Sequence, residues 1–202
     1  YSVNFSLWNP ADKKVLCTVD AGGQNPPYWT PNRPVVLGVQ TPKLSIWDST
    51  SCKFLKKLEG HAAAVSSVSW SRDGKALASA SYDKTIRVWS ASSGEVEHTL
   101  KDHTAAVAAV AWSPSGKTLA SASHDKTVRL WNPDDESSQA LEGHSGAVRT
   151  LAWAPLGNLL VSGGSDATLI VWDVKQQKAQ RTIKVFQPVQ SLACTTISKT
   201  VT

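Results

Sequence analysis

The sequence of 202 residues has no methionine and few cysteines. Its three cysteines, Cys17, Cys52 and Cys194, lie far apart and lack the Cys-x-x-Cys or Cys/His spacing of a structural zinc site. No apolar run reaches the roughly eighteen residues of a membrane span, and no charged-then-apolar leader opens the chain. These absences argue against a disulfide scaffold, a metal site, a membrane protein and a secretory precursor. Free thiols favour a reducing, intracellular compartment, either cytoplasmic or nuclear.

Charge is also scarce, because only 18% of the residues are Asp, Glu, Lys or Arg, and the formal net charge is +5. No acidic residue follows Asp173. The basic residues beyond that point are Lys175, Lys178, Arg181, Lys184 and Lys199. The whole net charge can therefore be assigned to this basic segment, 175–199. A contact with RNA would explain it, and so would a solvated outer strand with ordinary lysines.

Tryptophan is what the sequence has in excess, with nine Trp against three Tyr and three Phe. Four of them, Trp47, Trp89, Trp131 and Trp172, recur at intervals of 42, 42 and 41 residues. In three consecutive units a His precedes an Asp by 22 residues, and that Asp precedes the Trp by six. The His–Asp pairs are His61–Asp83, His103–Asp125 and His144–Asp166. The chain is therefore built from an internal repeat of about 40 residues.

Each repeat is predicted to form four short strands, because short runs of apolar and small residues alternate with turn-forming residues. No stretch keeps a helical period of 3.6 residues over helical length. The fold is therefore predicted to be all-β. A four-stranded antiparallel unit of this length is typical of a β-propeller blade, which packs both sheet faces against its neighbours. A second series, Trp70, Trp112 and Trp153, is expected to pack between blades rather than to stack nucleic-acid bases.

These motifs resemble the WD-repeat β-propeller family over nearly the whole chain. At the start of each clear repeat the matching residues are Gly60-His61, Asp102-His103 and Gly143-His144. Asp83, Asp125 and Asp166 match at the tight corner before the third strand, and we call them the corner aspartates. The third strand ends in Trp47-Asp48, Trp89-Ser90, Trp131-Asn132 and Trp172-Asp173. One repeat departs from the pattern. It has Val19 and Thr41 at the His and Asp positions and carries a Pro-rich insertion, 26–34. We expect that blade to be irregular and less stable.

Counting strands predicts four recognisable repeats with partial blades at both ends. The segments are a partial blade at 1–20, a degenerate repeat at 21–59, clear repeats at 60–101, 102–142 and 143–185, and the start of a further repeat at 186–202. The two ends supply two strands each, which together would close a five-bladed ring. Because an open arc leaves bare strand edges, we expect instead a fragment of a larger propeller whose missing blades either belong to an unobserved part of the chain or are supplied by another chain.

The resemblance implies a buried hydrogen-bond relay in each clear repeat, in which Trp donates to a serine, the serine meets His, and Asp orients the imidazole. The relay serine has two candidates in each of the first two clear repeats, Ser79 or Ser81 and Ser121 or Ser123. In the last repeat it is Ser162. Ser, His and Asp also make up a hydrolase triad. A triad occurs once, however, whereas this set recurs three times with a Trp attached. We therefore expect a structural relay, no catalytic residues, no cofactor and no small-molecule substrate.

Function is expected at exposed positions that vary between repeats. The resemblance implies that the loops carrying His and Asp share one rim, which is often used for partners. The candidate residues are Tyr82, His124 and Ser165 before the corner aspartates, Lys84 and Lys126 after two of them, and Arg149 on the predicted channel-lining strand, where other repeats have Ser66 and Ala108. Ordinary solvent exposure explains the aromatic positions equally well, and an internal ion pair would explain Arg149. The expected function is a protein-interaction scaffold in a multisubunit assembly, with an RNA-contacting subunit of a ribonucleoprotein as the alternative.

Overall fold

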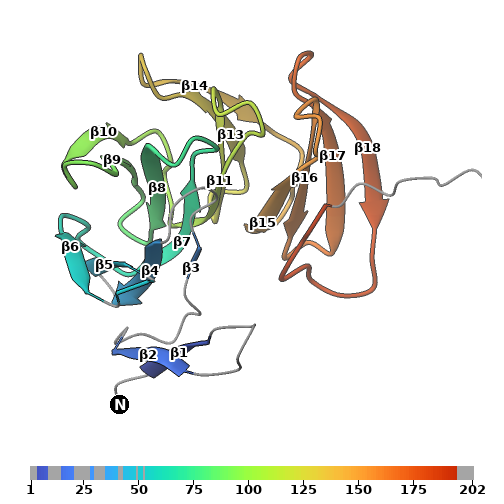
Figure 1. The fold of residues 1–202 in the computed structure, drawn as a ribbon. Helices are drawn as coiled ribbons and strands as arrows, with labels where there is room; N and C mark the ends of the chain where they lie inside the picture. The colour runs from blue at the N-terminus through green and yellow to red at the C-terminus, as the bar shows by residue number, and fades with distance from the viewer. Residues whose placement is uncertain are drawn as a thin grey trace, which may run out of the picture.

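A computed structural model describes residues 4–8, 15–20, 28–29, 35–40, 43–48, 50–51 and 53–194. Within these ranges every helix or strand assigned is a β-strand, so the described chain offers no helix that could cross a membrane. The strands form four antiparallel sheets of four strands and one hairpin of two strands (Figure 1). The predicted all-β architecture of four-stranded blades is confirmed.

The sheets follow the order of the chain. The N-terminal hairpin pairs β1 (Asn4–Trp8) with β2 (Val15–Asp20). The first blade contains β3 (Tyr28–Trp29), β4 (Val35–Gln40), β5 (Lys43–Asp48) and β6 (Phe54–Leu58). The second blade contains β7 (Val65–Trp70), β8 (Ala76–Ser81), β9 (Ile86–Ser90) and β10 (Val96–Leu100). The third blade contains β11 (Val107–Trp112), β12 (Leu119–Ser123), β13 (Val128–Asn132) and β14 (Ser137–Leu141). The fourth blade contains β15 (Val148–Trp153), β16 (Leu159–Gly164), β17 (Thr168–Asp173) and β18 (Lys178–Lys184).

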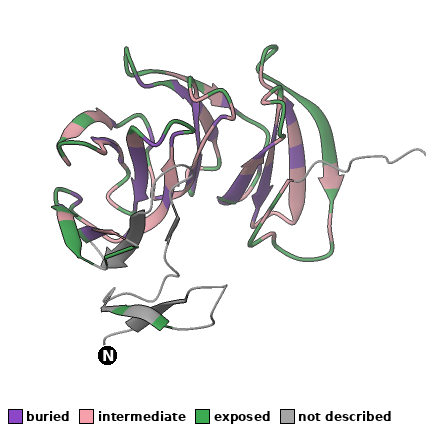
Figure 2. Cartoon of the chain, viewed as in Figure 1, coloured by how far each residue is buried: buried purple, intermediate pink, exposed green. Residues whose placement is uncertain are grey.

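The hydrophobic core lies between neighbouring blades. Ala78 and Ile86 of the second blade, for example, pack in one cluster with Val107 and Leu119 of the third, and all four are fully buried. Equivalent clusters join the first blade to the second and the third to the fourth. Burial therefore follows the inner and middle strands, while the outer strand β18 is largely exposed (Figure 2). Small alanines on β8 and β12 let adjacent sheets approach closely.

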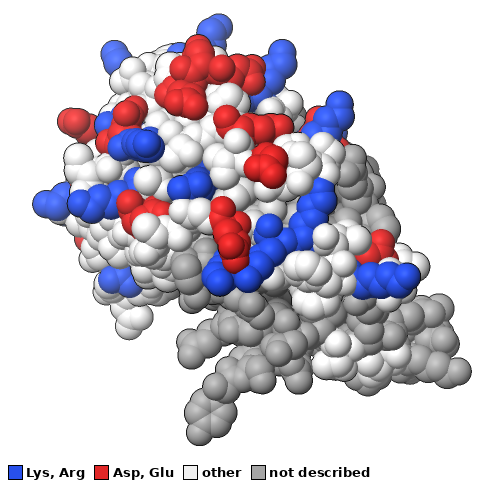
Figure 3. All heavy atoms as spheres, turned by 90° about the vertical axis from the view of Figure 1, so that its left-hand side faces the viewer, with Lys and Arg blue, Asp and Glu red and all other residues white. Residues whose placement is uncertain are grey.

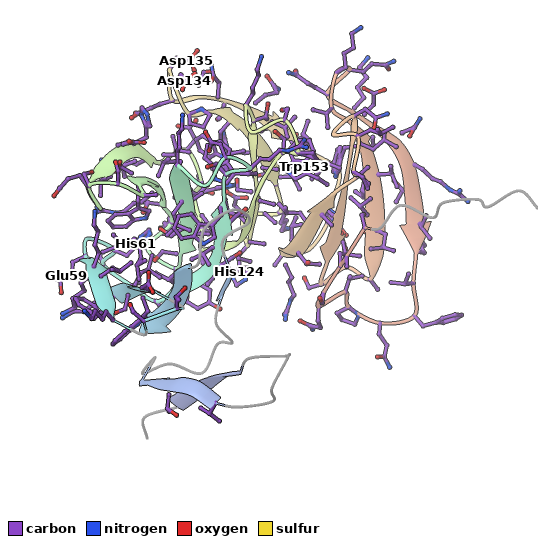
Figure 4. All side chains as sticks on the ribbon, in the orientation of Figure 1. Glu59, His61, His124, Asp134, Asp135 and Trp153 are labelled. Atoms are coloured by element: carbon purple, nitrogen blue, oxygen red, sulfur yellow. The ribbon has the colours of Figure 1, made fainter. Side chains whose placement is uncertain are left out.

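The Trp70, Trp112 and Trp153 series packs against these interblade clusters, as expected. Trp153 closes the boundary between the third and fourth blades, where its indole Nε1 donates to the carbonyl of Ala111 at 3.0 Å (Figure 4). Stacking of nucleic-acid bases would require exposed rings, and Trp153 is buried.

The fourth blade differs from the others on the face that points away from the third. Val161 and Val171 of this blade are only half buried, whereas Ala120 and Leu130, 41 residues earlier, are buried. Part of the face is covered by Val189, whose N–H donates to the carbonyl of Gly164 at 3.1 Å. The sequence predicted strands of a further repeat within 186–202, but residues 189–194 form no strand. No second strand pairs with them among the described residues.

Candidate functional site

A chain of hydrogen bonds runs through the second blade from the core to the corner between β8 and β9. The indole Nε1 of Trp89 donates to Ser79 Oγ at 2.8 Å, and this hydroxyl lies 2.7 Å from His61 Nε2. His61 Nδ1 lies 2.8 Å from Asp83 Oδ2. Because a carboxylate can only accept, the imidazole donates from Nδ1. In a neutral ring Nε2 is then an acceptor, so the serine donates its O–H to Nε2. Every polar atom of the relay thereby has a partner.

The third and fourth blades repeat this geometry almost unchanged. In the third blade the Trp–Ser, Ser–His and His–Asp distances are 2.8, 2.7 and 2.7 Å. In the fourth they are 2.8, 2.8 and 3.0 Å. The residues brought together are His103, Ser121, Asp125 and Trp131 in the third blade and His144, Ser162, Asp166 and Trp172 in the fourth. Repetition of one geometry in three sheets indicates a scaffold element rather than a single reactive centre.

The alternatives Ser81 and Ser123 lie outside the relay, which corrects their assignment to it. The Ser81 hydroxyl donates to the carbonyl of Ala63 and accepts the N–H of Asp83, both at 3.1 Å. Ser123 likewise accepts the N–H of Asp125. Serines two residues apart share one face of a strand, so alternation could not separate them. The fourth repeat held the deciding signal, because Gly164 stands at the Ser81 position and leaves only Ser162.

Sequence reasoning missed a further member of each relay, a threonine two residues after the corner aspartate. Thr85 Oγ1 donates to Asp83 Oδ1 at 2.6 Å, and Thr127 and Thr168 make the same bond at 2.7 and 2.8 Å. The threonine backbone N–H groups bond the same carboxylate oxygens. The recurring Asp-x-Thr spacing was the available signal. The threonine completes the set of groups that hold each aspartate ionised.

The aspartates remain strong acids although they are largely enclosed. Burial alone raises the pKa of Asp83, but hydrogen bonds from Thr85, His61 and the Ala62 N–H outweigh it and hold the pKa at about 2. The same balance holds the pKa of Asp125 and of Asp166 at about 2. Burial lowers the pKa of His61 more than Asp83 raises it. A neutral imidazole therefore meets an ionised carboxylate.

The first blade has no such relay at its third-strand tryptophan. Trp47 buries its indole Nε1 without a hydrogen-bond partner and packs edge-on against Phe54, with ring centroids 5.2 Å apart. The residue ten positions before it is Leu37, where the other blades have the relay serine. Thr41, predicted to replace the corner Asp, lies outside the described residues. So does most of the Pro-rich insertion, 26–34.

The varying corner positions meet on the rim of the second and third blades. The rings of Tyr82 and His124 lie 6.0 Å apart between centroids, tilted by 45°. Both side chains are exposed, and the N–H groups of both residues are fixed by the carbonyls of the preceding inner loops. Lys84 and Lys126, also exposed, follow the aspartates with φ of 72° and 74°. We call these four residues the aromatic rim.

The fourth blade continues this rim without a large side chain. Ser165 is half buried, and its Oγ lies against Gly146, close to where a Cβ on that residue would be. The Ser165 N–H donates to the carbonyl of Ala147 at 2.8 Å. The acidic turn before β14, marked by Asp134 and Asp135, lies at the opposite end of the third blade from His124 (Figure 4). In the third blade, therefore, the aromatic rim and this acidic turn lie at opposite ends.

Arg149 is exposed on β15, and its Nη1 donates to Gln190 Oε1 at 3.1 Å. In the part of the chain that the structure describes, no carboxylate lies within ion-pair distance of Arg149. Of the two explanations weighed for Arg149, the internal ion pair is therefore not observed among these residues, and the partner is a neutral amide. This partner lies 41 residues later, at the corresponding position of the next predicted repeat.

The basic segment does not form a single strip. A bulge in β18 places Gln180 outside the regular pairing, so that Lys178 pairs with Asp173 and Arg181 pairs with Val171. These two cations therefore lie on one face, while Lys184, which pairs with Thr168, lies on the other. Lys199 lies outside the described residues. Across those residues, no group of three potential metal ligands forms either.

Three segments of the chain match the family model of the WD domain, G-beta repeat, at residues 52–90, 94–132 and 135–173. Each runs from around the outer strand of one blade to the third strand of the next, and together they cover more than half of the chain. The chain therefore belongs to the WD-repeat family, whose repeats generally form non-catalytic scaffolds for protein–protein interaction.

A curated relative is Protein FIZZY-RELATED 2 of Arabidopsis thaliana, which is 32% identical over 84 residues. That match covers 40% of this chain and 17% of the relative. The aligned region is thus a small part of the relative's length.

Proposed function

We propose that this chain is a non-catalytic scaffold that binds another protein of a multisubunit assembly through the aromatic rim. The contact between Tyr82 and His124 carries the proposal, because two exposed rings from adjacent blades form one surface that neither blade has alone. Aromatic side chains are enriched at protein interfaces and supply large contact area for little entropy. Lys84 and Lys126 beside them favour a partner with acidic groups around its apolar contact.

The relay supports the non-catalytic part of this proposal. The hydroxyls of Ser79, Ser121 and Ser162 belong to fully buried residues, and each already bonds a Trp and a His. A serine nucleophile needs access to substrate and a nearby group that stabilises the oxyanion. Enclosure by two permanent partners gives these hydroxyls neither.

The test is a double variant, Tyr82→Ala with His124→Ala, compared in a quantitative pull-down with the unchanged chain. We expect unchanged circular dichroism and loss of the bound partner by tenfold or more, because aromatic anchors typically contribute about 2 kcal/mol or more. Leu156→Ala is the matched control, since Leu156 is an exposed apolar residue on the β15–β16 turn at the other end of the blades. Retention of the partner by the double variant, or equal loss in the control, would contradict the proposal.

A contact with RNA is the second candidate, favoured by the four exposed cations Lys175, Lys178, Arg181 and Lys184 of the fourth blade. Filter binding against salt tests it, because phosphate contacts give affinity that falls steeply with salt. Lys178→Glu with Arg181→Glu should then abolish binding, while Lys184→Glu on the opposite face should weaken it less. Absence of binding at low salt would remove this candidate.

A further inference from the structure

Two arginines occupy the same place in consecutive blades, each two residues before a relay tryptophan. The guanidinium carbon of Arg87 lies 5.9 Å from the ring centroid of Trp89, and that of Arg129 lies 5.9 Å from Trp131. Both bury Nε without a hydrogen-bond partner. The two arginines thus share a neighbouring indole, a buried Nε and an equivalent position on the third strand of the blade.

Arg129 is neutralised within its own blade. Its Nη1 donates to Ser138 Oγ at 2.6 Å and lies 3.4 Å from Asp102 Oδ2, and the Ser138 hydroxyl donates to the same carboxylate at 2.5 Å. The carboxylate comes from the residue immediately before relay His103. An arginine at this position therefore binds a carboxylate when one lies within reach.

Arg87 lacks the carboxylate that Arg129 has. The residue 42 positions before Asp102 is Gly60, and the Arg87 guanidinium lies where a Cβ on Gly60 would be. In the described part of the chain, no acid lies within ion-pair distance of Arg87. The adjacent Glu59 pairs instead with Lys57 at 2.7 Å and with Lys43 at 3.4 Å.

The overall charge of this surface would not direct a partner to Arg87. Basic and acidic side chains are interspersed on the face of the molecule that carries β6 and β10 (Figure 3). A partner attracted only by net charge would have no preferred place there. A half-buried guanidinium held over an indole, in contrast, presents a fixed fork that fits a carboxylate.

We propose that Arg87 is a docking site for an acidic side chain of a protein partner, which pairs with its guanidinium as Asp102 pairs with that of Arg129. Gly60 supplies no acid of its own, and its lack of a side chain lets the guanidinium pack against its backbone. The site does not depend on the aromatic rim, because the two are carried by different residues. Loss of one by mutation is expected to leave the other in place.

The experiment follows the arginine Nε–H resonances of the full chain during titration with a peptide of alternating Glu and Gly. The comparison probes are the corresponding Gln–Gly peptide and inorganic phosphate. We expect the Arg87 resonance to shift saturably with the Glu peptide alone, while Arg129, already paired, stays unchanged. Arg87→Gln should weaken peptide binding at least tenfold, the loss of a charge-assisted hydrogen bond. Arg129→Gln should retain it.

Thr99→Glu provides an independent check that needs no ligand. Thr99 is the cross-strand partner of Arg87, so a carboxylate there would neutralise the arginine internally, shift its resonance and block the Glu peptide. Equal responses of Arg87 and Arg129, binding of the Gln peptide, a phosphate response equal to that of the Glu peptide, or unchanged binding by Arg87→Gln would each overturn the proposal.

Discussion

The first blade and the three that follow form the same four-stranded sheet, but the tryptophan of the third strand is hydrogen-bonded differently in its interior. Trp89, Trp131 and Trp172 donate to a buried serine, whereas Trp47 buries its indole N–H without a partner. In the first blade, strand pairing and apolar residues such as Leu44 still form a core with the second blade. The sheet therefore does not require the relay. The relay instead ties the sheet interior to the corner loops.

This difference gives the two kinds of blade different dependence on pH, which is the largest effect we expect. Asp83, Asp125 and Asp166 have pKa values of about 2 in the folded chain against 3.8 ordinarily. Because the unfolded chain then binds more protons, stability is present above about pH 4 and is lost as the pH falls toward 2. The pKa values of His61 and His103 are lowered from 6.5 by burial, so stability begins to fall already below about pH 6.5.

Urea denaturation at pH 7, 5.5, 4 and 2.5, followed by tryptophan fluorescence, measures this dependence. His103→Gln is the companion variant, since it removes one of the two histidine contributions and should flatten the decline between pH 6.5 and 5. Stability that is constant from pH 7 to pH 2.5 would contradict the assignment of ionised aspartates and neutral histidines.

Removing one corner aspartate should produce the next largest effect. Asp125 accepts bonds from His103, Thr104 and Thr127, so Asp125→Ala leaves the part-buried donors of His103 and Thr127 unpaired. We expect a loss of about 3 kcal/mol in the free energy of unfolding. Asp135→Ala, in an exposed turn of the same blade, is the matched control and should cost about 0.5 kcal/mol or less. Chemical denaturation of both variants decides, and similar losses would show that the relay adds no stability.

The tryptophans test the comparison directly. Trp131→Phe keeps most of the packing but leaves Ser121 and His103 with an incomplete relay, which should cost about 1 to 3 kcal/mol. Trp47→Phe removes an N–H that has no partner, so it should cost less. Denaturation midpoints of the two variants measure the difference. A larger loss at Trp47 would mean that packing rather than hydrogen bonding separates the blades.

Much of this architecture could be predicted from spacing alone, because a repeat places equivalent residues at equivalent positions. The His–Asp–Trp spacing identified the relay members, and the fourth repeat could have resolved the serine alternatives through Gly164. The splitting of the basic segment could not be predicted, since the bulge at Gln180 changes which face each later residue occupies. The contact of Gln190 with Arg149 depends on the path of a segment that forms no strand.

The backbone of the relay corners provides the smallest and most selective test. Ala167 follows Asp166 with φ of 55°, a left-handed conformation that costs a non-glycine residue about 1 kcal/mol. Ala167→Gly relieves this cost while the side-chain relay stays intact, so we expect a gain of about 0.5 kcal/mol. Ala147→Gly, which has no positive φ to relieve, should instead lose a similar amount because glycine gains freedom in the unfolded chain. Opposite signs in thermal denaturation would separate the backbone strain of the corner from its polar network, and equal losses would contradict that separation.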